Sequence, residues 1–427
     1  MTTLPKKLNL HRTVLKNGII LLVSENSAAD IIAARIFIRA GSCNEKPEKA
    51  GLANLLSAVL TKGCDGLSSL EIAQRVESVG ASLSADAATD YFVLSLKTVS
   101  ADFTQTLELA TRILRSPTFP AESVEMEKRI ALQDVRLQKE QPFNVAFEQL
   151  RQIMYKNHPY ASSGLGDETT ISSLTREDLV KFYSYYFRPD NIVISIVGRI
   201  SPEDATKQVE ELFGDWQTLD TVLPTIDIPF PQTKPQQIIT PQATQQSIIM
   251  LGYLGASVQE ADYPALKLLS TYLGNGLSSR LFIELREKLG LAYDVSALYP
   301  TRKFSSSFVV YMGTAPENTT TALAGLRREV DLLSSSKLAE SALQTAKNKI
   351  LGQYALGKQT NGQIAQIYGW YEILGLGIAF DQKFQQDITA LTPVDTINAA
   401  SKYLKEPFVS VIGQKEAINR VIAATVV

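Results

Sequence analysis

The stretch LTREDLVKFYSYYFRPDNIVISIVG, residues 174–198, returns in shortened form as LTPVDTINAASKYLKEPFVSVIG, residues 391–413. Each copy begins with Leu-Thr, which suits a helix N-cap because a threonine hydroxyl can accept a hydrogen bond from a free backbone N–H of the first turn. Each copy ends in an apolar, β-branched run closed by glycine, which predicts a buried strand. The repeat indicates that the chain arose by internal duplication.

A second echo supports the duplication. Tyr91–Lys97, followed by a Ser-Ala-Asp-Phe-Thr turn and a helix, matches Ser307–Met312, followed by Ala-Pro-Glu-Asn-Thr and a helix. Between the halves, residues 223–241 contain five prolines and no amphipathic period, which predicts a linker. We therefore expect an α+β fold of two homologous domains, residues 1–222 and 242–427. Each should be a mostly antiparallel sheet with helices packed mainly on one face.

Composition narrows the classes of function. The 427 residues are 45% hydrophobic and 20% charged, which suits two buried cores. Lysine plus arginine (42) nearly balances aspartate plus glutamate (44), so nothing favours nucleic acid or an anionic membrane surface. The longest apolar runs have the length of strands, which predicts no membrane span.

The N-terminal residues show neither the apolar core nor the cleavage site of a signal peptide. The two cysteines, Cys43 and Cys64, have no neighbouring His or second Cys and are compatible with reduced thiols. We expect a cytoplasmic protein, the alternative being an organellar one after removal of a transit peptide.

Histidines are scarce. The chain has two, His11 and His158, and each stands alone in the sequence. A catalytic zinc usually takes at least one histidine ligand, commonly two or three, and keeps a position open for water. We expect both histidines to be surface or packing residues.

The segment AGLANLLSAVLTKG, residues 50–63, predicts an amphipathic helix that stops at Gly63. Positions i, i+3 and i+4 of a helix share one face, so the side chains separate into two stripes. The apolar stripe consists of Leu52, Leu55, Leu56, Val59 and Leu60, and the opposite stripe of Asn54, Ser57, Ala58 and Thr61.

This run resembles the zinc helix of the pitrilysin/processing-peptidase family, whose pattern is A-G-L-A-H-x-x-E-H-x-L-x-K-G. The His, Glu and His of that pattern fall on Asn54, Ser57 and Ala58. An amide, a hydroxyl and a methyl group cannot replace two imidazole ligands and a glutamate that accepts a proton from water. The family's third ligand, a glutamate on a later charged helix, falls by spacing at Asp134. The resemblance thus predicts that this chain binds no metal.

The run GNGLSSRLFIELREKLGLAYDVSALY, residues 274–299, resembles the family's second-domain pattern, G-x-G-x-S-S-R-L-F-x-x-L-R-E-x-x-G-L-A-Y. Gly274-Asn275-Gly276 alone is a weak phosphate-loop signal and no Gly-Lys-Ser/Thr follows, so we expect no nucleotide. Within the run we expect Ser278 or Ser279 as a helix N-cap, Leu281, Leu285 and Leu289 as a core stripe, and Gly290 at C′.

The same run contains Arg286 and, seven residues later, Tyr293. In the family, this pair points across a chamber at the zinc site of the facing domain. A guanidinium offers forked donors to carbonyls or carboxylates, and a phenol can donate to the oxyanion of a tetrahedral intermediate. The alternative is a purely structural role, in which Arg286 makes a surface ion pair and Tyr293 packs against its neighbours.

The resemblance implies a non-catalytic, substrate-binding subunit of a heterodimeric zinc metallopeptidase. A homologous partner would hold the zinc in an intact His-x-x-Glu-His helix, and this chain would be inactive alone. Unfolded peptides would enter a clamshell-like chamber and pair as an added strand on a sheet edge of the zinc-bearing chain. Two alternatives stay open: a structural core-type subunit of a larger complex, and a pseudoenzyme that binds peptides without cleavage.

Overall fold

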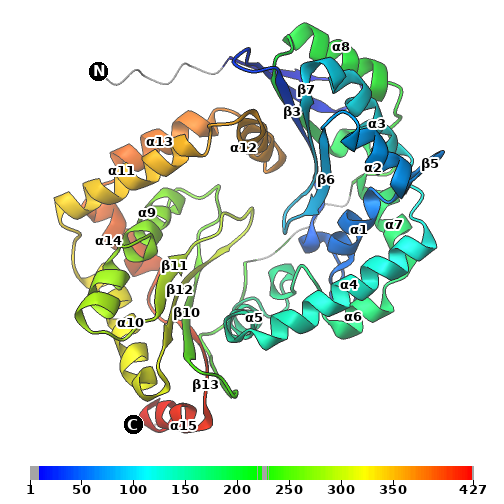
Figure 1. Ribbon diagram of the computed structural model, residues 1–427. Coiled ribbons are helices and arrows are strands. Elements are labelled where there is room, and N and C mark those ends of the chain that lie inside the picture. Colours follow the sequence, from blue (N-terminus) through cyan, green and yellow to red (C-terminus); the bar gives the residue numbers. More distant parts are fainter. Residues whose placement is uncertain (1–8, 219, 224–227, 229, 426–427) are drawn as a thin grey trace. The chain divides into compact units, whose positions relative to one another are not determined.

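The computed structural model describes residues 9–218, 220–223, 228 and 230–425, and the chain forms two compact units (Figure 1). These units do not coincide with the predicted ranges 1–222 and 242–427, because a helical segment of each half belongs to the unit of the other half. Unit 1 consists of Met1–Val135, Ser163–Ile226 and Ala355–Phe380; unit 2 consists of Arg136–Ser162, Asp227–Tyr354 and Asp381–Val427.

Unit 1 contains a six-stranded sheet in the order β1-β2-β8-β3-β7-β6. The β2–β8 pair is parallel and the other pairs are antiparallel, which confirms the expected mostly antiparallel sheet. The strands are β1 (Leu10–Val14), β2 (Ile20–Glu25), β3 (Ile31–Ile38), β6 (Ser82–Ala87), β7 (Phe92–Val99) and β8 (Ile192–Gly198); the short strands β4 (Gly63–Cys64) and β5 (Leu67–Ser68) pair separately.

The two faces of this sheet are covered by different parts of the chain. Ile36 and Ile38 of β3 lie in the core that includes residues of α1 (Leu52–Leu60) and α3 (Phe103–Arg115). Phe37, on the opposite face, meets α12 (Asn361–Ile373), which packs on β3 and β8. Side chains alternate between the faces of a strand, so β3 serves two cores at once.

Unit 2 contains a five-stranded sheet in the order β11-β12-β10-β13-β9, with one parallel pair, β13–β9. One face of this sheet is covered by α5 (Pro142–Met154), which packs on β10 and β13. A Cβ at Gly252 of β10 would lie 2.5 Å from Met154 Sδ, so glycine permits this close approach. The strands are β9 (Gln237–Pro241), β10 (Ser247–Gly255), β11 (Asp294–Leu298), β12 (Ser306–Thr314) and β13 (Phe408–Gly413).

Two sequence predictions differ from the structure. The apolar, β-branched run Thr13–Ser24 predicts a single strand, but it belongs to the hairpin of β1 and β2, because Gly18 takes a left-handed φ of 91° and turns the chain. The last residues of the predicted linker, 237–241, form β9 beside β13, while residues 224–227 and 229 of that linker lie outside the described part of the chain.

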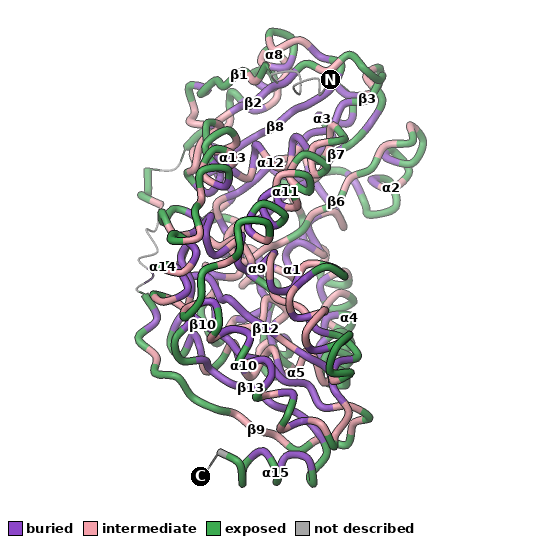
Figure 2. Tube along the Cα trace, turned by 90° about the vertical axis from the view of Figure 1, so that its left-hand side faces the viewer, coloured by how far each residue is buried: buried purple, intermediate pink, exposed green. Residues whose placement is uncertain are grey.

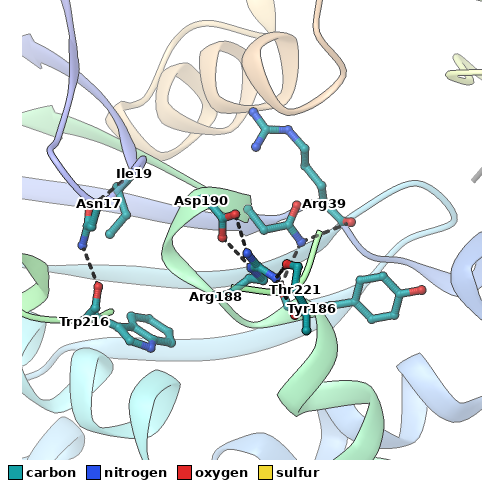
Figure 3. A network of polar contacts seen from close by, with 9 residues as sticks. Asn17, Ile19, Arg39, Tyr186, Arg188, Asp190, Trp216 and Thr221 are labelled. Atoms are coloured by element: carbon teal, nitrogen blue, oxygen red, sulfur yellow. Dashed lines mark hydrogen bonds and ion pairs between the residues drawn. The ribbon is translucent and has the colours of Figure 1, made fainter. Parts of the chain in front are cut away.

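A buried arginine holds the turn before β8 in unit 1 (Figure 3). Arg188 donates from Nε and Nη2 to the two carboxylate oxygens of Asp190, at 2.6 and 2.8 Å, and from Nη1 to the Thr221 carbonyl at 2.6 Å. The neighbouring Asn191 amide donates to the Tyr186 carbonyl at 2.9 Å. A bidentate pair in which all three guanidinium nitrogens donate hydrogen bonds is a form in which a buried arginine is well tolerated.

In Figure 2 the buried trace follows the inner strands of each sheet, whereas α2 and α4 are largely exposed. No described helix has the length and apolarity that crossing a membrane requires. The remaining helices are α2 (Ser69–Glu77), α4 (Ala121–Glu140), α6 (Glu168–Ser173), α7 (Arg176–Tyr186), α8 (Pro202–Phe213), α9 (Tyr263–Gly274), α10 (Thr319–Ser335), α11 (Glu340–Leu356), α13 (Phe380–Ala390), α14 (Pro393–Tyr403) and α15 (Lys415–Thr425).

Candidate functional site

The helix at the degenerate zinc motif is α1, and its start is fixed by a glycine and a glutamate. Gly51 has φ 93°, and a Cβ there would lie 2.7 Å from the Leu165 carbonyl oxygen. The two oxygens of Glu45 accept hydrogen bonds from the N–H groups of Gly51 (2.9 Å) and Ala53 (2.6 Å). Burial raises the pKa of Glu45 to about 8, against the opposing effect of these two N–H donors.

Sequence reasoning missed Glu45. The signal was a carboxylate shortly before a helix start, where it can satisfy free N–H groups. It escaped because Glu45 lies between two 3₁₀ turns, Ser42–Asn44 and Pro47–Lys49, and the second of these turns brings it back onto α1.

The three motif positions lie on α1 as predicted, and their chemistry does not fit a metal. Ser57 is buried, and its hydroxyl donates to the Asn54 carbonyl at 2.7 Å. Asn54 and Ala58 are partly exposed. Within the described ranges, no group of three His, Cys, Asp or Glu side chains is placed to hold a metal ion. The donor set therefore lacks what a zinc site needs.

Asp134 is exposed on α4. Two turns earlier on the same face of α4, Glu127 forms an ion pair of 2.9 Å with Lys62, which follows α1. The family spacing thus leads to a carboxylate on the side of α4 that meets the end of α1, but no imidazole accompanies it.

The second motif, in unit 2, is held in place by Arg280, the arginine of its Ser-Ser-Arg run. Arg280 Nε donates to Glu329 of α10 at 2.8 Å, and Glu329 is 2% exposed. Leu281 and Leu285 are fully buried, as expected. Gly290 has φ 61°, and Leu291 N–H bonds to the Leu285 carbonyl at 2.9 Å, which confirms the predicted glycine C′ end.

Two details of this helix were predicted wrongly. Residues Phe282–Lys288 form wide π-type turns, so a stripe spaced for 3.6 residues per turn drifts and Leu289 is 50% exposed. Ser279 is buried, but its hydroxyl has no hydrogen-bond partner among the described residues, so it provides no side-chain cap.

The side chains of Arg286 and Tyr293 are exposed and make few contacts that stabilise unit 2. The Arg286 guanidinium lies 4.9 Å from the centre of the Phe282 ring and forms no ion pair with any described carboxylate. Tyr293 is 63% exposed; its backbone N–H donates to Gly313 at 2.9 Å. Its hydroxyl has no hydrogen-bond partner in the described part of the chain. The structure therefore shows neither a surface ion pair at Arg286 nor a packed ring at Tyr293 within the described residues.

The remaining candidate residues are structural. His158 is 6% exposed, its Nδ1 accepts from the Tyr160 N–H at 3.0 Å, and burial lowers its pKa to about 4. His11 lies exposed on β1. Cys43 and Cys64 are buried and are not joined in a disulfide.

Comparison with protein families agrees with this geometry. Residues 21–168 match the insulinase family, peptidase family M16, and residues 173–350 match the peptidase M16 inactive domain. The two matches share one family and follow one another along the chain. The chain belongs to peptidase family M16 and consists of two domains of that type.

Individual relatives span most of the chain. An uncharacterized zinc protease of Bacillus subtilis is 24% identical over 358 residues, which is 84% of this chain and 87% of the relative. One of Rickettsia bellii is 24% identical over 95% of this chain and 98% of its own length. A peptidase M16 inactive domain from Pseudomonas fluorescens superposes with a TM-score of 0.87 at 26% identity, covering 96% of this chain and 99% of that one.

Proposed function

We propose that this chain is the non-catalytic, substrate-binding subunit of a heterodimeric zinc metallopeptidase that cleaves unfolded peptides. It contributes Arg286 and Tyr293 to a composite active site whose zinc is held by a homologous partner chain. One observation carries the proposal: the motif helix keeps its core stripe while Asn54, Ser57 and Ala58 supply no ligands, and the Arg/Tyr pair stays exposed and without ion-pair or hydroxyl partners in the described structure.

The chemistry of the pair suits peptide hydrolysis. Arg286 offers a permanent cation with forked donors for a substrate carbonyl or carboxylate. The Tyr293 hydroxyl can donate to an oxyanion, a contact whose removal costs on the order of 3 kcal/mol in other enzymes. The names of the relatives, zinc proteases, support the reaction class. A cytoplasmic location is part of the proposal, and it is supported by Cys43 and Cys64, which are buried and not joined in a disulfide.

The test uses the full chain, purified alone and after co-expression with a homologue that has an intact His-x-x-Glu-His helix. Cleavage of an unfolded fluorogenic peptide and zinc content are measured for both preparations. We expect zinc and cleavage only in the complex, with cleavage reduced about a hundredfold by Tyr293→Phe. Cleavage by the lone chain would overturn the proposal.

The two alternatives give different results in the same experiment. A structural core-type subunit would form the complex, yet Arg286→Ala and Tyr293→Phe would leave cleavage unchanged. A peptide-binding pseudoenzyme would bind the peptide with no turnover beside any zinc-bearing partner. Tyr185→Phe, at a tyrosine that is 51% exposed on α7, is the matched control.

A further inference from the structure

A cavity of about 760 Å³ lies within unit 2, between α9, β11, α11 and α13. Figure 1 shows these four elements in one part of unit 2. The polar part of its wall includes Lys267, Ser270 and Thr271 of α9 and Gln353 of α11, and the apolar part includes Ile350 and Phe384. A volume of this size is within the range of small-molecule and peptide-end sites.

The position of this cavity follows from the internal duplication. The run LKLLSTYL of α9, residues 266–273, aligns with ANLLSAVL of α1, residues 53–60. Lys267, Ser270 and Thr271 then take the places of Asn54, Ser57 and Ala58, the degenerate metal-ligand positions of unit 1.

The surrounding elements agree with this alignment. Helix α9 packs against the edge strand β11 of its sheet, and α1 packs against the edge strand β6 of its own. Gln353 of α11 lies seven residues before Thr360, the N-cap of α12. Asp134 of α4 lies seven residues before Gln141, the N-cap of α5, so the two residues hold equivalent positions in the two halves. The cavity of unit 2 is therefore the counterpart of the family's metal site, with an ammonium group at the first ligand position.

The charge of the cavity is positive. Lys267 Nζ donates to the Tyr299 carbonyl at 2.9 Å, and it forms no ion pair with any carboxylate in the described part of the chain. Burial lowers the pKa of Lys267. Arg302 is a second cation in the wall, and no aspartate or glutamate is among the lining residues. A largely desolvated ammonium with only a neutral partner is stabilised strongly by an anion.

We propose that this cavity binds the free C-terminal carboxylate of a peptide, with the charge at Lys267 and Arg302 and an apolar terminal side chain against Ile350 and Phe384. The charge and shape of the cavity select a carboxylate attached to an apolar body. The choice of a peptide as its source rests on the proposed function of the chain. A second binding point, formed by residues other than Arg286 and Tyr293, would hold one end of an unfolded substrate.

The test measures binding to the purified chain alone, so that it needs neither the partner nor cleavage. The probe is an N-terminally fluorescein-labelled hexapeptide ending in leucine, as the free acid and as the amide, followed by fluorescence anisotropy. We expect the free acid to bind about tenfold or more tightly than the amide, because amidation removes the charge that faces Lys267.

Three variants locate the binding. Lys267→Met should weaken the free acid about tenfold or more, and Lys267→Arg should retain most of its affinity, which separates loss of charge from misfolding. Gln353→Glu places a negative charge in the wall and should also weaken binding. Lys337→Met, at an exposed lysine after α10, is the matched control and should change nothing.

Equal affinities of acid and amide, or unchanged binding by Lys267→Met, would overturn the proposal. Binding of hexanoate, measured by isothermal titration calorimetry, without any binding of the acid peptide would overturn the peptide as the source of the carboxylate. Arg286 is not among the residues that line the cavity, so Arg286→Ala should keep the preference for the acid over the amide, which Lys267→Met should lose. A failure of the composite active site is thereby distinguishable from a failure of the cavity.

Discussion

Arg12 of β1 donates from Nη2 to Glu372 of α12 at 2.8 Å, across 360 residues of sequence. Glu372 is 8% exposed, and its Oε2 has no hydrogen-bond partner among the described residues. The pair joins the first strand of unit 1 to a helix that comes from the second half of the chain. The pair therefore lies where α12, a helix from the second half of the chain, packs on the sheet of the first half.

Removing Arg12 should destabilise the protein, because the buried Glu372 carboxylate would lose its charged partner. We expect Arg12→Ala to lower the free energy of unfolding by about 1–3 kcal/mol, measured by urea unfolding. Arg199→Ala removes an exposed pair with Asp30 at 2.7 Å and should cost less than about 1 kcal/mol. Equal effects of the two variants would contradict the assigned role of Arg12.

The seating of α12 on the sheet should depend on Gly369. A Cβ at this position would lie 2.2 Å from Phe37 Cε2, so Gly369→Ala should destabilise by about 1–3 kcal/mol through overpacking. Gly352, within α11, has no atom within 4 Å of such a Cβ. Gly352→Ala should therefore be neutral or stabilise by up to about 1 kcal/mol, and thermal unfolding of both variants checks the contrast.

Glu45 should make stability depend on pH. Its pKa is raised to about 8 in the folded protein from an ordinary 4.5, so its contribution is fully present below pH 4.5 and is lost as pH rises through 8. We expect the wild type to lose stability relative to Glu45→Gln between these values. A difference in unfolding free energy that is flat from pH 5 to 8 would show that burial does not control this carboxyl.

The chain should bind no zinc with stoichiometric affinity, and a chelator should leave its melting temperature unchanged. A variant with four substitutions, Asn54→His, Ser57→Glu, Ala58→His and Asp134→Glu, has two imidazoles and two carboxylates at the family spacing and should be able to bind zinc. This variant should retain about one zinc per chain after dialysis, measured by atomic absorption. Stoichiometric zinc in the unmodified chain would contradict the prediction.

Arg286 and Tyr293 should matter for activity and not for stability. Tyr293 is 63% exposed and its hydroxyl has no partner within the described ranges, so Tyr293→Phe should change the unfolding free energy by less than about 0.5 kcal/mol. The same should hold for Arg286→Ala. A large loss of stability in either variant would show that the side chain supports the fold, and a loss of cleavage could then not be assigned to substrate contact.

Residue patterns alone predicted the duplication, the sheet-and-helix character of both halves, and the absence of ligands at Asn54, Ser57 and Ala58. These features are local: a hydrophobic period and a residue identity are readable without knowing what the chain packs against. The same holds for Gly290, whose place after an amphipathic run predicted its left-handed conformation.

The packing of α5 and α12 could not be predicted from residue patterns. A helical period shows which face is apolar but not which sheet receives it, and both helices cover a sheet of the other half. The π-type turns that expose Leu289, and the return of Glu45 to the start of α1, likewise depend on contacts distant in sequence. The positive cavity around Lys267 exists because α9, β11, α11 and α13 come together to line it, and that arrangement depends on contacts distant in sequence.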